Sequence, residues 1–186
     1  LDIFKRDIVQ HARNFEWIGY LSSTGVYGDH QGRWVTEDAI CHAQDNIGKQ
    51  RLAAEQAWLE LYQQHHLPVH IFRLAGIYGP NRSSIDRIKA GKSSTIFKQD
   101  QVFSRTHIHD LVRVLAASLA APTPGEIFNI CDDCPAGMHE VDQYAADLLQ
   151  KKLKIIPYDA ASQSAMSAHF FASNKRISNA KIKKTF

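Results

Sequence analysis

The stretch Trp17-Ile-Gly-Tyr-Leu-Ser-Ser-Thr-Gly-Val-Tyr-Gly28 decides the fold class of this chain. An apolar, aromatic-rich run predicts a strand over residues 16–21, and it ends abruptly in three hydroxyl residues and a Gly-x-x-Gly turn. In an open parallel α/β sheet, ligands bind just beyond the carboxyl ends of the strands. We therefore expect Ser22, Ser23 and Thr24 to present hydroxyl groups at a ligand crevice.

The next 60 residues predict a strand–helix–strand unit. Apolar residues recur at helical spacing over residues 48–65, which predicts an amphipathic helix. Pro68 closes that helix, and the apolar run Val69–Leu74 predicts a second strand, which is followed by a glycine turn over Gly76–Pro80. A crossover between parallel strands is right-handed, so both glycine turns are expected at the same edge of one sheet.

The remainder of the chain continues the alternation of helices and strands. Residues 28–45 are polar and predict a long functional loop. Periodicity predicts helices over residues 2–13, 83–91, 108–120 and 140–149, and strands over residues 94–98 and 126–131. Residues 150–174 are weakly patterned. An α/β protein built on parallel strands is the fold class that this order favours.

Composition is that of an ordinary soluble protein. The chain has 186 residues, of which 44% are hydrophobic and 22% charged, and no apolar run approaches the roughly 20 residues of a membrane span. Three cysteines favour a reducing, cytoplasmic compartment over a disulfide scaffold. Cys131 and Cys134 have the CxxC spacing, but no second pair completes a zinc site, so we expect two incidental thiols and no metal.

Positive charge gathers at the end of the chain. Residues 151–186 hold eight Lys and Arg residues and a single acidic residue, Asp159. A basic tail can bind nucleic acid or an acidic surface. Apolar and small residues interrupt these charges over residues 175–184, which favours the solvated face of a short helix over nucleic-acid binding.

Three segments carry a resemblance to a known family. Ser22-Ser-Thr-Gly-Val-Tyr-Gly28, Arg73-Leu-Ala-Gly-Ile-Tyr-Gly-Pro80 and Arg105-Thr-His-Ile-His-Asp-Leu111 resemble motifs of the extended and atypical short-chain dehydrogenase/reductases, which form the NAD-dependent epimerase/dehydratase family. The resemblance spans most of the chain and implies a partial Rossmann-like doubly wound parallel sheet with a small carboxy-terminal substrate-binding portion. Residues 1–80 would be the carboxyl-side half of the dinucleotide-binding domain, and residues 81–186 a mixed portion.

The glycine-rich turn of a dinucleotide site is missing from the sequence. The ten glycines form no G-x-G-x-x-G, the turn that cradles the pyrophosphate. The resemblance begins about halfway into the nucleotide-binding half of the family. We therefore expect the chain to be a fragment of a longer protein.

The resemblance assigns catalytic positions. Ser23, four residues before Tyr27, stands at the catalytic hydroxyl of the family, with Thr24 in reserve. The Tyr-x-x-x-Lys motif of the family runs on into Leu-Ala-Ala-Glu, so it aligns with Ile47-Gly-Lys-Gln-Arg51. Arg51 stands in place of the lysine, and Ile47 cannot transfer a proton as the tyrosine does. Whether the site is catalytic is left open by this departure.

Cofactor and substrate contacts follow from the same motifs. The resemblance implies cofactor contacts at Ser22 and at the backbone of three residues after the second strand: Ala75, Gly76 and Ile77. Arg105 is a candidate for an anionic group of the substrate. Arg73 is expected to be a structural ion-pair partner. Tyr27 and Tyr78 are expected to pack under the turns rather than to donate protons.

The function that the resemblance implies is that of an NAD(P)-dependent epimerase or related oxidoreductase. The complete protein would bind NAD or NADP and act on a nucleotide sugar or related small molecule, with no membrane partner; a homodimer is left open. One alternative is a non-catalytic NAD(P)-binding sensor or scaffold. The second is a nucleic-acid or protein interaction module that uses the basic tail.

Overall fold

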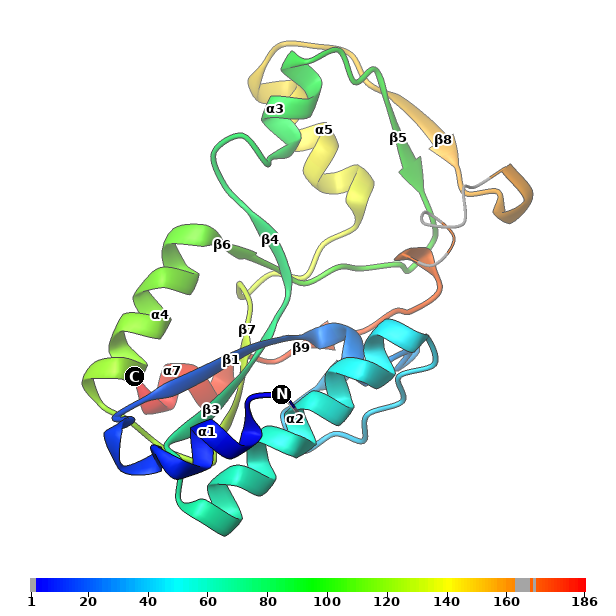
Figure 1. The fold of residues 1–186 in the computed structure, drawn as a ribbon. Helices are drawn as coiled ribbons and strands as arrows, with labels where there is room; N and C mark the ends of the chain where they lie inside the picture. The colour runs from blue at the N-terminus through cyan, green and yellow to red at the C-terminus, as the bar shows by residue number, and fades with distance from the viewer. Residues whose placement is uncertain (1–2, 163–167, 169) are drawn as a thin grey trace.

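A three-stranded parallel sheet forms the centre of the protein. The computed structural model describes residues 3–162, 168 and 170–186. Strands β1 (Ile18–Ser23), β3 (Val69–Leu74) and β7 (Ile127–Ile130) lie in the order β1-β3-β7 (Figure 1). The register sets Ser23 beside Leu74, and Leu74 beside Ile130. The carboxyl ends of all three strands therefore meet at one edge.

Helices cover both faces of this sheet (Figure 1). Helix α2 (Asn46–His65), with α1 (Lys5–Gln10), packs on the face of Val69 and Ile71. Helices α4 (Ile108–Ala120) and α7 (Ala180–Thr185) pack on the face of Phe72. Since side chains alternate along a strand, β3 supplies both cores and is buried at every position.

A smaller lobe stands beyond the carboxyl edge of the sheet (Figure 1). Helices α3 (Ser84–Lys89) and α5 (Met138–Leu148) pack together there, beside strands β5 (Ser94–Phe97) and β8 (Lys154–Pro157). Between lobe and sheet, β4 (Gly76–Tyr78) pairs in parallel with β6 (Arg105–His107).

Short elements complete the described residues. Three turns of 3-10 helix cover Ala12–Asn14, Thr24–Tyr27 and Ala160–Ser162. Strand β2 (Trp34–Val35) pairs with β9 (Arg176–Ile177), which brings the carboxy-terminal segment beside the loop after β1. Within the described residues, no helix combines the length and the apolar character needed to cross a membrane.

The predicted α/β class and the parallel strands are confirmed, but several predicted boundaries are wrong. β1 runs on to Ser23 because its hydrogen-bond ladder with β3 continues to Leu74. Gly76–Tyr78 is a strand rather than a turn, since β6 lies beside it. The amino-terminal helix stops at Gln10, and the predicted loop over residues 28–45 contains β2.

Candidate functional site

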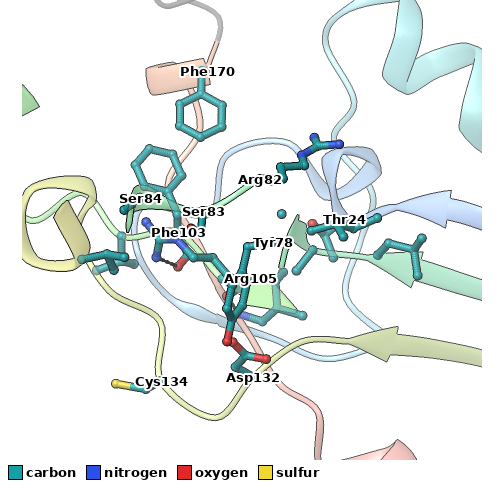
Figure 2. Close-up of a pocket in the computed structure, with 18 of the residues that line it drawn as sticks. Thr24, Tyr78, Arg82, Ser83, Ser84, Phe103, Arg105, Asp132, Cys134 and Phe170 are labelled. Atoms are coloured by element: carbon teal, nitrogen blue, oxygen red, sulfur yellow. Dashed lines mark hydrogen bonds between the residues drawn. The ribbon is translucent and has the colours of Figure 1, made fainter. Parts of the chain in front are cut away.

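A cavity of about 750 Å³ opens where the sheet meets the smaller lobe. Its size lies in the range of small-molecule sites, roughly 300–1,000 Å³. The end of β1 and strand β4 form one side, and α3, α5 and the segment around Phe170 form the other (Figure 2). The cavity therefore lies at the carboxyl ends of parallel strands, the edge predicted from the sequence.

Ser23 and Thr24 line this cavity. Ser23 has extended backbone angles, and its Oγ accepts a hydrogen bond of 3.1 Å from the Gly25 N–H at the start of the 3-10 helix. Because that bond uses an oxygen lone pair, the hydroxyl proton is left to donate to a bound molecule. The structure thus holds the hydroxyl of Ser23 in one place beside the cavity.

A buried polar cluster lies beneath this turn. The Arg73 guanidinium donates to both Glu55 carboxylate oxygens, at 2.8 Å from Nη2, and to the Tyr27 hydroxyl at 2.9 Å. Ser22 donates to Glu55 at 2.5 Å, and Tyr27 donates to Asn129 at 2.7 Å. All five residues are buried. The expected ion-pair role of Arg73 is confirmed, and the Ser22 hydroxyl faces Glu55 rather than the cavity.

Tyr27 is held in its neutral form. It is fully buried, and burial raises the pKa of its phenol to about 12, although the adjacent Arg73 acts to lower it. A phenol with that pKa stays protonated at neutral pH, and it packs beneath the turn as the sequence predicts. Proton transfer at this site therefore needs another group.

The helix that carries the catalytic motif of the family lies outside the cavity. Ile47 is 65% exposed, and neither Ile47 nor Arg51 belongs to the cavity lining. Asp45 caps the helix by accepting a hydrogen bond of 2.7 Å from the Gly48 N–H. Arg51 does not line the cavity with Ser23 and Thr24, and its catalytic role stays a prediction.

The three residues that follow β3 line the cavity. They are Ala75, Gly76 and Ile77. The Ala75 N–H donates to the Ile130 carbonyl, and the Gly76 N–H donates to the Ser104 carbonyl. A Cβ at Gly76 would make an ordinary van der Waals contact with the Ser104 carbonyl oxygen at 3.5 Å, so the glycine does not relieve a clash within the protein. The backbone at this position, which carries no side chain, fits a flat ring such as nicotinamide.

Cationic side chains surround the cavity. Arg105 lines it and donates through Nη1 to the Phe103 and Ala136 carbonyls at 2.9 and 3.0 Å. Burial lowers the pKa of Arg105, and no carboxylate among the described residues lies within ion-pair distance of it. Three further cations line the same cavity: Arg82, Arg87 and Lys175. This arrangement favours an anionic ligand.

An aromatic wall belongs to the side formed by the smaller lobe. The rings of Phe103 and Phe170 stack with centroids 4.4 Å apart, and both line the cavity (Figure 2). Sequence reasoning missed this wall because neither phenylalanine stands in a motif.

Tyr78 is placed differently from the sequence expectation. It lines the cavity instead of packing beneath a turn, and its hydroxyl points toward the carboxyl of Asp132, another lining residue (Figure 2). The packing prediction was wrong because Gly76–Tyr78 is a strand, which turns the Tyr78 ring to the same side as Gly76. Asp132 carried no signal in the sequence.

Cys131 and two lysines of the basic tail have bonding partners within the protein. The buried Cys131 donates to the Ile177 carbonyl at 3.3 Å, and burial raises its pKa to about 12. No group of three or more His, Cys, Asp and Glu side chains in the described part of the chain is arranged to hold a metal ion. In the tail, Lys183 pairs with Asp133, and Lys181 pairs with Glu126.

Comparison with known proteins places these features in context. The sequence profile of the NAD dependent epimerase/dehydratase family matches residues 5–131. Protein YeeZ of Escherichia coli strain K12 is 36% identical over 123 residues, which cover 64% of this chain and 41% of that protein.

Solved structures share the fold. A functionally unknown conserved protein from Silicibacter pomeroyi DSS is 42% identical with a TM-score of 0.93, over 99% of this chain and 64% of that one. A UDP-glucuronic acid 4-epimerase from Bacillus cereus, solved with NAD, is 17% identical with a TM-score of 0.77, over 98% of this chain and 59% of that one. The chain thus spans less than two thirds of each relative.

Proposed function

This chain belongs to the NAD dependent epimerase/dehydratase family, and on that premise we propose that it supplies the substrate pocket of an NAD(P)-dependent oxidoreductase or epimerase. The proposed substrate is a small anionic molecule of the nucleotide-sugar class. The observation that carries the proposal is that one cavity is lined by Ser23, Gly76 and Arg105, which supply a hydroxyl, a backbone without a side chain and a guanidinium.

The cations support an anionic substrate. Arg105 is half-buried, its charge lacks a carboxylate partner among the described residues, and two carbonyls fix one of its nitrogens. A diphosphate would satisfy the remaining N–H groups through charge-assisted hydrogen bonds. Arg87 is tied to Asp142 at 3.2 Å, so it adds charge at a fixed place.

The three lining residues after β3 support the assignment of the nicotinamide end of the cofactor to this cavity. When bound, the cofactor accepts or returns a hydride. Ala75, Gly76 and Ile77 would lie against the ring, and Ser23 would donate its hydroxyl proton to the substrate oxygen. The glycines of these 186 residues form no glycine-rich turn of the kind that holds the pyrophosphate end.

A non-catalytic binding role is the second candidate. The observation that favours it is the exposure of Ile47, which stands in place of the tyrosine of the family and does not line the cavity. A protein with this pocket and no proton-transfer group would bind NAD(P) and the anion without turnover.

Calorimetric titration of the complete protein tests the proposal. We expect saturable binding of NAD or NADP, and of UDP and UDP-glucuronate. Arg105→Ala should weaken UDP binding by roughly 10–100-fold, since hydrogen bonds to charged groups contribute about 1.5–3 kcal/mol.

Arg113→Ala is the matched control, because this arginine is 83% exposed on α4 and outside the cavity. Equal UDP affinity in the wild type and Arg105→Ala would refute the anion site. Failure to bind either dinucleotide would refute the cofactor assignment.

A further inference from the structure

Tyr78 and Asp132 are neighbouring titratable side chains that line the cavity. Strand β4 sets Tyr78 opposite His107 of β6, and the two rings meet edge to face with centroids 5.1 Å apart. Asp132 lies two residues after the end of β7, and its N–H donates to the Arg105 carbonyl at 2.6 Å. Figure 2 shows the Tyr78 phenol crossing the pocket, with its hydroxyl against the Asp132 carboxyl.

The surroundings of the Asp132 carboxyl raise its pKa. The Tyr78 hydroxyl points toward it, and within the described chain it has no ion-pair partner at contact distance. Burial raises its pKa, and the negative charge of Asp110 on α4 acts in the same direction. His107 acts in the opposite direction, to lower the Asp132 pKa, and Asp132 in turn acts to raise the pKa of Arg105.

Other titratable groups at the cavity lack such a partner. The Lys175 amine donates to the Gly28 carbonyl at 2.9 Å and to Ser173 at 3.1 Å, which ties it to the wall. Cys134 is exposed at the rim. Among the described lining residues, Tyr78 and Asp132 are a phenol and a carboxyl that lie side by side.

We propose that Tyr78 and Asp132 are the proton-transfer pair of this pocket, in place of the tyrosine that the family carries on α2. This inference rests on the proposed function. The substrate hydroxyl gives its proton to the Tyr78 oxygen as the phenol proton passes to Asp132. With the cofactor bound, the hydride of the adjacent C–H bond would pass to the oxidised nicotinamide, and the substrate carbon would become a carbonyl. Re-reduction reverses both transfers.

The chemistry of the pair suits this role. A carboxyl whose pKa is raised accepts a proton more readily than an ordinary aspartate, and a phenol beside it can relay that proton without a free phenolate. Ser23, which lines the same cavity, donates its hydrogen bond to the same substrate oxygen. Tyr78 is therefore the catalytic residue, and Asp132 acts through it.

The test uses the complete protein with NAD or NADP and four substrates: UDP-glucose, UDP-galactose, UDP-glucuronate and dTDP-glucose. Tyr78→Phe and Asp132→Asn should each lower kcat by about 10²–10⁴-fold, the usual contribution of a general acid–base group. UDP affinity by calorimetry should change less than about threefold, because Tyr78 and Asp132 contribute to the chemical step rather than to binding the anion. Tyr62→Phe is the control, since this half-buried phenol packs with the α2 core outside the cavity.

A titration separates chemistry from structure. Carbon-13 NMR of the Asp132 carboxyl should give the same pKa as the acid limb of the kcat/KM profile. Tyr78→Phe should raise that carboxyl pKa, because the Tyr78 hydroxyl acts to lower it. Where Asp132→Asn fails to fold, Tyr78→Phe with an unchanged Tm carries the test alone.

Three outcomes would overturn the inference. Tyr78→Phe with kcat within threefold of wild type, in a protein that binds NAD and UDP, refutes the pair and leaves the proposed function standing. Binding of both ligands with turnover of none of the four substrates refutes the pair and favours the non-catalytic role. Absence of NAD(P) binding refutes the proposed function, and the pair with it.

Discussion

Arg73→Met in the complete protein should expose how much the turn beneath Ser23 depends on one buried cation. The substitution removes three hydrogen bonds to Glu55, one to Tyr27 and one to the Glu37 carbonyl. Glu55 is 2% exposed, so its carboxylate would stay buried without a counter-ion. Breaking a buried pair from one side typically costs about 3–5 kcal/mol, because the remaining charge is uncompensated.

That cost sets the size of the expected effect. Each kcal/mol lowers the Tm of a domain of about 150–250 residues by roughly 2–4 °C, so Arg73→Met should lower it by about 6–20 °C. The assay is thermal unfolding followed by circular dichroism, with urea unfolding for the free energy. Arg113→Met, on the exposed face of α4, is the control and should change stability by less than about 0.5 kcal/mol.

A double variant tests the reasoning itself. Glu55→Gln combined with Arg73→Met removes the uncompensated charge, so it should be more stable than Arg73→Met alone. The ion-pair argument is refuted if Arg73→Met costs less than about 1 kcal/mol, or if the double variant is the less stable of the two.

The remaining predictions concern pH, the hydroxyl and helix α2. His70 accepts a hydrogen bond from the Thr123 N–H at 2.8 Å, and burial lowers its pKa, so the unfolded chain binds the proton more tightly than the native one. Stability should therefore fall as pH drops below about 6.5, and urea unfolding of His70→Gln should show a flatter pH dependence; an identical slope would contradict this. Ser23→Ala should weaken binding of UDP-glucuronate to the NAD-loaded protein by about 2–12-fold, for a lost hydrogen bond of about 0.5–1.5 kcal/mol, and an unchanged calorimetric Kd would remove Ser23 from the site. Ile47→Tyr with Arg51→Lys should change turnover less than about twofold, because the side chain at 47 is solvent-exposed outside the cavity; a gain of tenfold or more would assign proton transfer to α2.

Local sequence was sufficient for elements whose ends carry their own signals. β3 over Val69–Leu74 and α4 over Ile108–Ala120 agree with prediction at every residue. Pro68 precedes the strand, and His107 caps the helix by accepting from the His109 N–H. Such signals act within a few residues, so they can be read without knowing the fold.

Strand partners required the tertiary structure. β1 extends to Ser23 and β4 exists over Gly76–Tyr78 because β3 and β6 lie beside them. A strand end is set by where its hydrogen-bonding neighbour stops, and that neighbour can be far along the chain.

The features of the candidate site likewise fall into those that the sequence predicted and those that required the tertiary structure. Sequence alone determined the family resemblance, the strand-end position of Ser23 and the candidates Gly76 and Arg105, since each stands in a contiguous motif. Only the tertiary structure decided that Tyr78 lies beside Asp132 and that Arg51 does not line the cavity. A contact between side chains from separate strands depends on how those strands are arranged in space, and no local pattern in either segment encodes that arrangement.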